Sequence, residues 1–155
     1  FHGRRTDAVC ELRSSTFSGT VYADPVMPTA DGVTINNVFF APGARTFWHT
    51  HEVGQVLTVI AGEGWVCVDG QDAQKLTVGD IVWIPKGQRH WHGATATSYL
   101  LHTAVSIGQT VWEEEVTDDQ FGDARVECHT CDGANIGGDI LLVLQPRLVV
   151  EMPIM

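Results

Sequence analysis

The sequence predicts a single all-β domain, a barrel or sandwich of short strands. The chain has 155 residues, close to the ~150 residues of one average domain. Apolar residues make up 44% of it and charged residues 18%, which is enough to bury a core. The 16 glycines and 6 prolines allow many tight turns. Between residues 17 and 112 the turn signals recur every ~8–12 residues, a spacing typical of all-β folds.

The expected strands are apolar segments separated by Gly, Pro and Asp. In chain order they are 17–23, 33–40, 45–51, 55–60, 64–69, 73–77, 81–84, 89–93, 97–107 and 110–112. One short helix is expected near 117–124, since Thr117 and Gln120 have the spacing of a capping box. Trp48 and Trp91 alternate with histidines, so we expect them on the outer faces of their strands. The acidic run 113–115 is expected to be a solvated turn that needs no cation partner.

The chain is expected to comprise an N-terminal arm (1–16), a barrel (17–121) and a C-terminal extension (122–155). The apolar tail from Ile140 onward favours a strand that covers a sheet edge or pairs with a second subunit, so a homodimer is expected. Cys128 and Cys131 have CxxC spacing, but no second pair accompanies them. Two free thiols, or a local disulfide in a loop, are therefore favoured over a zinc or redox site.

The charge balance excludes several classes of partner. Nine basic and 19 acidic residues give a formal net charge of −10. Such a surface repels phosphate backbones and anionic lipid, so neither nucleic acid nor a membrane surface is an expected partner. No apolar run reaches the ~18 residues of a membrane span. The four cysteines are too few for a disulfide framework, and we expect reduced thiols in a cytoplasmic protein.

The histidines carry the strongest functional signal. Five of the seven fall between His49 and His102. His49 and His51 are two residues apart in a strand segment, as are His90 and His92, so each pair shares one face. A single inward histidine is more often a hydrogen-bonded core residue, but two such pairs favour a metal site. Two antiparallel strands can bring three imidazoles and an amide oxygen to one ion, and imidazole suits Mn, Fe, Co, Ni, Cu or Zn.

Two motifs in this region resemble those of the cupin superfamily. The first consists of Gly43, His49-x-His51, Gln55 and Gly62, with Gln in place of the usual Glu, and the second of Gly79, Pro85-x-Gly87 and His90. The resemblance implies a cupin double-stranded β-helix, a small jelly-roll barrel. It also implies one divalent ion held by His49, His51, Gln55 and His90.

Residues 17–121 resemble more closely the bacterial manganese cupins with hydroxynitrile lyase activity, and the carboxymuconolactone-decarboxylase-associated cupins. This resemblance rests on segments such as Trp48-His-Thr-His51, Gly79-Asp-Ile-Val-Trp83 and His90-Trp-His-Gly-Ala94. It implies manganese first, with iron, nickel or zinc as alternatives, and His92 and His102 as catalytic histidines facing the cavity. The implied substrate pocket consists of Asn36, Val38, Phe40, Thr46, Leu57, Leu100 and Ser106. Asn36 and Ser106 make it more polar than in some relatives, and Glu52 stands where relatives commonly have Pro.

The implied ligand set favours Lewis-acid chemistry. Three neutral imidazoles and a neutral amide leave a divalent ion its full +2 charge, which polarises a bound oxygen. A nearby histidine can then move a proton. We therefore expect an enzyme of the lyase, isomerase or cyclase type, with hydroxynitrile-lyase-like C–C bond chemistry on a small oxygenated metabolite. The alternatives are an O₂-dependent dioxygenase of a phenolic or enolic substrate and a non-catalytic small-molecule-binding cupin. Turnover without oxygen separates the first two.

Overall fold

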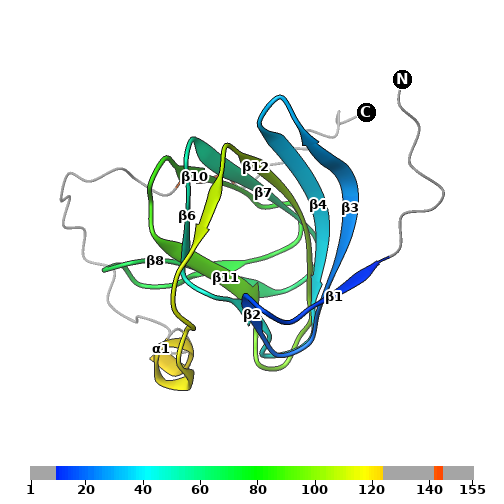
Figure 1. Cartoon of the computed structure of the whole chain (residues 1–155). Coiled ribbons are helices and arrows are strands. Elements are labelled where there is room, and N and C mark those ends of the chain that lie inside the picture. Colours follow the sequence, from blue (N-terminus) through cyan, green and yellow to red (C-terminus); the bar gives the residue numbers. More distant parts are fainter. Residues whose placement is uncertain (1–9, 124–141, 145–155) are drawn as a thin grey trace, which may run out of the picture.

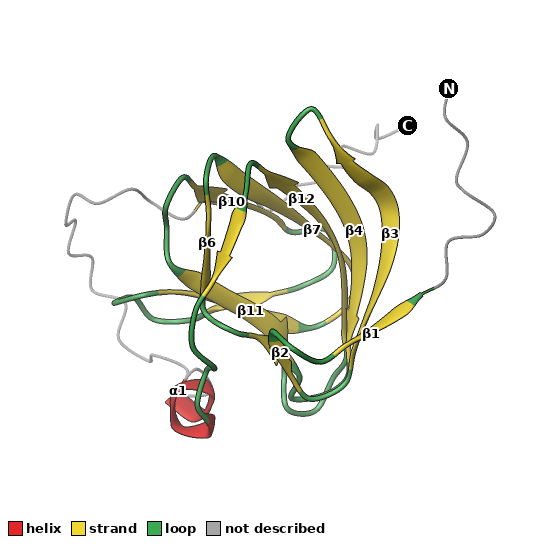
Figure 2. Ribbon diagram, in the orientation of Figure 1, coloured by secondary structure: helices red, strands yellow, loops and turns green. Residues whose placement is uncertain are grey.

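The computed structural model describes residues 10–123 and 142–144, which form a β-barrel with one short helix. Figures 1 and 2 show the arrangement of these elements. The strands are β1 (Glu11–Arg13), β2 (Phe17–Ser18), β3 (Val21–Ala30), β4 (Val33–Phe40), β5 (Arg45–Thr46), β6 (His49–His51), β7 (Gly54–Gly62), β8 (Gly64–Val68), β9 (Gln74–Leu76), β10 (Ile81–Pro85), β11 (His90–Ala94), β12 (Leu100–Ile107), β13 (Thr110–Trp112) and β14 (Leu142–Leu144), and the helix is α1 (Asp118–Asp123).

Two antiparallel sheets curl around one interior (Figure 1). The large sheet has the strand order β1-β3-β4-β12-β7-β10-β14. The small sheet has the order β13-β6-β11-β5-β2, and β8 joins it by pairing with β11 and β9. The all-β barrel predicted from the turn spacing is confirmed. The strands that carry the histidine pairs, β6 and β11, are neighbours in the small sheet.

The barrel interior follows from the two-residue alternation of the strands. In β12, Leu100, His102 and Ala104 point inward and are buried, while the residues between them are partly exposed. The same alternation buries Phe40 in β4 and Leu57 in β7, both 0% exposed. These apolar side chains pack together between the sheets. The inward polar residues lie on the same strands, so the site is built on the barrel core.

The expected strand 45–51 is two short strands, β5 and β6, instead of one. The ladder breaks because the Phe47 amide donates to the Thr16 carbonyl and the Trp48 amide donates to the Glu114 carbonyl. In an unbroken strand Thr46 and His49 would face opposite sides, since they are three residues apart. With the break, both side chains line the same interior cavity. The irregularity therefore adds a hydroxyl to the histidine face.

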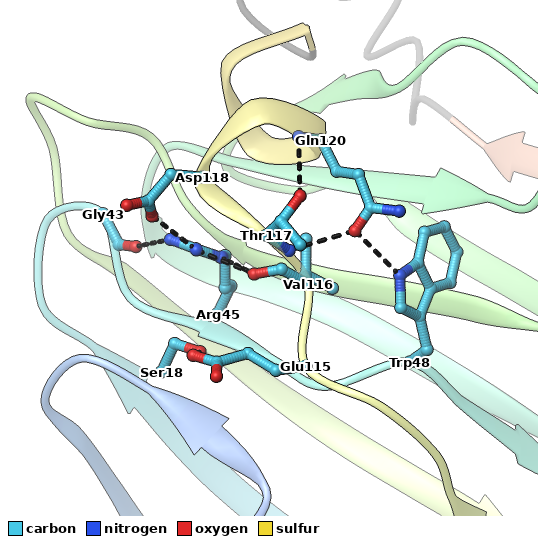
Figure 3. A network of polar contacts seen from close by, with 9 residues as sticks. All are labelled: Ser18, Gly43, Arg45, Trp48, Glu115, Val116, Thr117, Asp118 and Gln120. Carbon is cyan, nitrogen blue, oxygen red and sulfur yellow. Dashed lines mark hydrogen bonds and ion pairs between the residues drawn. The ribbon is translucent and has the colours of Figure 1, made fainter.

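The capping box at the start of α1 is confirmed (Figure 3). The backbone amide of Gln120 donates to Thr117 Oγ1 at 3.3 Å, and the backbone amide of Thr117 donates to Gln120 Oε1 at 3.0 Å. Buried Arg45 joins this segment to the small sheet, because its guanidinium donates to the Val116 carbonyl and to the Asp118 carboxylate, both at 2.8 Å. The helix is thereby fixed against the outside of the barrel.

An apolar cluster lies on the outer face of the small sheet, behind the histidines. It contains Trp48, Trp91 and, from the α1 segment, Phe121, which confirms the outward orientation of both tryptophans. Arg89 covers this cluster with its Cζ 4.2 Å from the Trp48 ring centroid. The expectation for the acidic run 113–115 is wrong, because Arg89 forms ion pairs with both Glu113 and Glu114. The side chain that stacks on Trp48 thus also binds two carboxylates of the acidic turn.

The chain ends contribute two edge strands to the large sheet. From the expected N-terminal arm, β1 pairs with β3. From the expected extension, β14 pairs with β10, with Val143 opposite Val82. The domain boundaries and the homodimer remain predictions, and Cys128 and Cys131 lie outside the described residues. Within the described part of the chain, no helix has the length and hydropathy of a membrane span.

Candidate metal centre

Three histidines of the small sheet converge on one point between the two sheets. His49 lies directly opposite His90 in the β6–β11 ladder, and His51 shares the inward face of β6. One ring nitrogen from each of the three lies within 4.8 Å of the others. All three side chains are buried. The strand pairing therefore gathers the three predicted histidine ligands into one group.

The outer ring nitrogens of two of these histidines are held by backbone carbonyls. His49 Nδ1 lies 2.9 Å from the Phe47 carbonyl oxygen, and His90 Nδ1 lies 2.8 Å from the Gln88 carbonyl oxygen. A carbonyl only accepts a hydrogen bond, so Nδ1 carries the proton in each ring. Each Nε2 then keeps its lone pair, which is the arrangement a metal ligand requires.

Gln55 supplies an amide oxygen from the large sheet. Its Oε1 lies 3.2 Å from His90 Nε2, while its Nε2 donates to Ser106 Oγ at 3.0 Å. In this orientation two acceptors, the imidazole lone pair and the amide oxygen, face each other. A shared cation makes that contact favourable. His51 Nε2 is also buried and has no hydrogen-bond partner among the described residues. His49, His51, Gln55 and His90 therefore fit a divalent ion.

Burial keeps the ligand histidines neutral. Desolvation lowers the pKa of His51 from its ordinary 6.5 to about 4 and that of His90 to about 3. The pKa of His49 is well below its usual range, through burial and then through the neighbouring His90. At neutral pH these rings carry no proton on the nitrogens that face the centre, so metal binding has no proton to displace there.

A second pair of buried histidines lies beside the metal centre. His92 Nδ1, on β11, is 3.1 Å from His102 Nε2, on β12, so this hydrogen bond joins the two sheets. The His92 ring centroid is 5.3 Å from that of His49, and His92 Nε2 has no partner among the described residues. Burial lowers the pKa of His102 to about 4, and burial together with the adjacent His102 lowers that of His92 well below 6.5. Both rings are neutral at pH 7.

A cavity of about 150 Å³ opens onto His49, His51 and His92. Its lining includes the expected pocket residues Asn36, Val38, Thr46 and Ser106, together with His49, His51, Gln55 and His92. Phe40, Leu57 and Leu100 share the inward face of their strands but lie in the apolar core outside this lining. His102 also lies outside the lining, next to His92. The two-residue alternation gives the face of a residue but not its depth in the barrel.

The cavity has further walls that the sequence did not indicate. They are formed by Phe17, Thr34, Gly108, Thr110 and Trp112, while Ala104 lines the cavity from the inward face of β12, as expected for the strand of His102. Thr110 and Trp112 enter because β13 pairs with β6, which places Thr110 opposite His51 and Trp112 opposite His49. Thr110 and Trp112 share one face of β13 because they are two residues apart in the strand. The partner strand that brings this face to the histidines could not be read from the sequence.

Comparisons with known proteins agree with this geometry. The family model for the cupin domain matches residues 37–105. An (R)-mandelonitrile lyase of Granulicella tundricola is 43% identical over 111 residues, which are 68% of this chain and 85% of that protein. The chain belongs to the cupin family.

Two solved structures place the barrel among known cupins. A cupin-like protein from Thermotoga maritima superposes with a TM-score of 0.73 at 32% identity, covering 76% of this chain and 96% of that one. A polyketide cyclase from Streptomyces resistomycificus has a TM-score of 0.60 at 18% identity, covering 76% of this chain and 87% of that one, and it shares the fold. The double-stranded β-helix predicted from the two motifs is therefore confirmed.

Proposed function

We propose that this protein is a metal-dependent lyase that cleaves the C–C bond beside the hydroxyl group of a small α-hydroxynitrile. The observation that carries the proposal is one cavity lined both by His49, His51 and Gln55 of the ligand group and by His92, whose Nε2 is buried and unpartnered among the described residues. The 43% identity to an (R)-mandelonitrile lyase supports both an enzymatic function and this reaction class.

The metal site has a neutral donor set. His49, His51, His90 and Gln55 would hold the ion, with manganese as the first candidate and iron, nickel or zinc as alternatives. When bound, the ion supplies a positive charge that polarises a substrate oxygen. Ser106 accepts from the Gln55 amide nitrogen and so keeps the amide oxygen turned toward His90. The protein itself contributes no carboxylate to this donor set.

His92 is the proposed general base. In the tautomer where His92 Nδ1 donates to His102 Nε2, the Nε2 atom of His92 has a free lone pair. This atom accepts the hydroxyl proton of the substrate. The resulting imidazolium keeps its hydrogen bond to His102, which thus orients and stabilises the charged ring. Lowering of the pKa of His92 by burial ensures that the base starts neutral.

The proposed reaction balances without any oxidant. The hydroxyl O–H bond breaks as its proton moves to His92 Nε2, and the C–C bond breaks as the oxygen becomes a carbonyl. The bonding electron pair leaves with cyanide. His92 returns the proton to cyanide, so the products are a carbonyl compound and hydrogen cyanide. The reverse sequence forms the α-hydroxynitrile.

The cavity limits the size of the substrate. Its volume is about 150 Å³, and a cavity of about that size holds a benzene-sized ring. Phe17, Val38 and Trp112 supply an apolar wall, while Asn36 and Ser106 supply a polar one. A single-ring or short aliphatic hydroxynitrile with a polar substituent suits this lining.

The test is turnover of racemic mandelonitrile and of an aliphatic hydroxynitrile, with the protein reconstituted in turn with Mn²⁺, Fe²⁺, Ni²⁺ and Zn²⁺. Aldehyde release is measured with and without oxygen. We expect equal metal-dependent turnover in both atmospheres and an excess of one enantiomer in the reverse reaction. Oxygen-dependent consumption of a phenolic or enolic substrate would replace the proposal by a dioxygenase function. Binding without turnover under every condition would leave a small-molecule-binding protein.

A further inference from the structure

The three histidine ligands differ in what holds their outer ring nitrogens. For His49 and His90 the partner is a carbonyl of the same chain segment, two residues earlier. For His51 the partner is a side chain, and its Nδ1 lies 3.1 Å from Thr110 Oγ1. A hydroxyl both donates and accepts, whereas a carbonyl only accepts. Among the described residues, His51 is therefore the one histidine ligand of the three whose tautomer no backbone carbonyl fixes.

The contact between Thr110 and His51 is built into the sheet. The two residues are direct partners in the β13–β6 ladder, so their side chains emerge side by side on the inner face. The Thr110 side chain lines the cavity, and its hydroxyl has no other hydrogen-bond partner in the described part of the chain. His51 Nε2, on the other side of the ring, is buried and unpartnered within that part. The Thr110 bond thus holds the ring from its Nδ1 side.

We propose that Thr110 is a positioning residue for the metal centre, which accepts the Nδ1 proton of His51 so that Nε2 presents its lone pair to the ion. The inference rests on the metal site of the proposed function and is independent of the lyase reaction. Removing the partner behind a ligand histidine costs about 10–100-fold in metal affinity in characterised sites. We expect a loss of this size when Thr110 loses its hydroxyl.

The experiment compares metal affinity in Thr110→Val, Thr110→Ser and wild type, by equilibrium dialysis with Mn²⁺ or Zn²⁺ as the only ligand. Valine keeps the shape and removes the hydroxyl, whereas serine keeps the hydroxyl. Thr103→Val is the matched control, because Thr103 lies on β12 and donates to Asn37 Oδ1 at 2.7 Å, away from the histidine group. Thr110→Ala is a second hydroxyl-free variant for use if valine disturbs packing.

We expect weakened binding in Thr110→Val and Thr110→Ala, and wild-type affinity in Thr110→Ser and Thr103→Val. In addition, ¹⁵N spectra of the Zn²⁺-loaded, histidine-labelled wild type should show His51 protonated at Nδ1. Unchanged affinity in Thr110→Val, a loss that serine does not restore, or a proton on His51 Nε2 in the loaded protein would each overturn the inference. A wild type that binds no divalent ion would overturn the proposed function as well, and this result differs from a failure confined to the Thr110 variants.

Discussion

His102 Nε2 lies 3.1 Å from His92 Nδ1, and the two rings belong to opposite sheets of the barrel. The pair has no carboxylate partner among the contacts described, unlike the Ser-His-Asp arrangement in which an acid orients the base. In this protein the neutral imidazole of His102 stands where that arrangement has its acid. Both rings are buried, so the surrounding barrel packing holds them in this relative position.

Replacing His92 by Ala should lower kcat by about 10²–10⁴-fold, the usual contribution of a general base. The metal content should stay at the wild-type level, because His92 is not among the expected ligands. Elemental analysis and kcat measured on the same preparation check both parts. His90→Ala is the contrast, since it should deplete the metal. Unchanged turnover in His92→Ala would exclude the proposed base.

Replacing Gln55 by Glu should retain the metal but reduce turnover by about tenfold or more, since a carboxylate partly neutralises the ion and weakens its polarising effect. Ser106 can still hydrogen-bond to the new side chain by donating its hydroxyl proton. Gln74→Glu makes the same change at an exposed position of β9 and should have no effect. Wild-type kcat in a fully loaded Gln55→Glu variant would contradict the charge argument.

The stability of the metal-free protein should fall as the pH is lowered from about 6.5 toward 4. The folded-state pKa is about 4 for His51, about 3 for His90 and about 4 for His102, against ~6.5 in the unfolded chain. In this window the unfolded chain binds protons that the folded chain does not. Each histidine therefore lowers the free energy of unfolding by up to about 1.4 kcal/mol per pH unit.

Urea unfolding in the presence of a chelator at pH 7.5, 6.0 and 5.0 measures this slope above the range where most carboxylates titrate. His102→Leu should reduce the slope of the free energy of unfolding against pH by the contribution of one histidine. A free energy of unfolding that does not change between pH 7.5 and 5.0 would show that these rings are not held neutral by burial.

Replacing Gly93 by Ala should lower the free energy of unfolding by about 1–3 kcal/mol, as overpacking does in tight interiors. A Cβ at this position would lie 2.6 Å from Arg45 Cα and in conflict with the Ala44 carbonyl oxygen. It would therefore push β5 away from β11, the strand that carries His90 and His92. Gly122→Ala, in α1 with open space around it, is the control. It should be neutral or stabilising by up to about 1 kcal/mol. Thermal or urea unfolding of both variants checks the difference.

The sequence predicted those features that depend on local chemistry. The segment 33–40 matches β4, and the capping box of Thr117 and Gln120 forms as expected. For His49, His51 and His90, the spacing predicted only that each His-x-His pair shares one face; the cupin resemblance supplied the ligand set, which the β6–β11 pairing brings together. For β4 and the capping box, the signal lies within a few residues of the feature it describes.

Features that depend on distant pairing could not be predicted. The break between β5 and β6 arises from amide bonds to Thr16 and Glu114, which are far away in the sequence. Likewise, Arg89 forms ion pairs with Glu113 and Glu114, which lie 24 and 25 residues further along the chain, and only the fold brings them together. Leu57 has the inward face that the alternation gives, but it lies in the apolar core and not at the cavity where the resemblance placed it.

Trp112 has a consequence for the study of this protein. Its ring centroid lies 4.6 Å from that of His49, and the residue lines the cavity and is 40% exposed. An open-shell ion such as Mn²⁺ held by His49 would quench the emission of an indole at this range, whereas closed-shell Zn²⁺ would quench it far less. The protein therefore contains an intrinsic fluorescent reporter of its own loading state, and Trp112→Phe should remove the metal-dependent part of the signal.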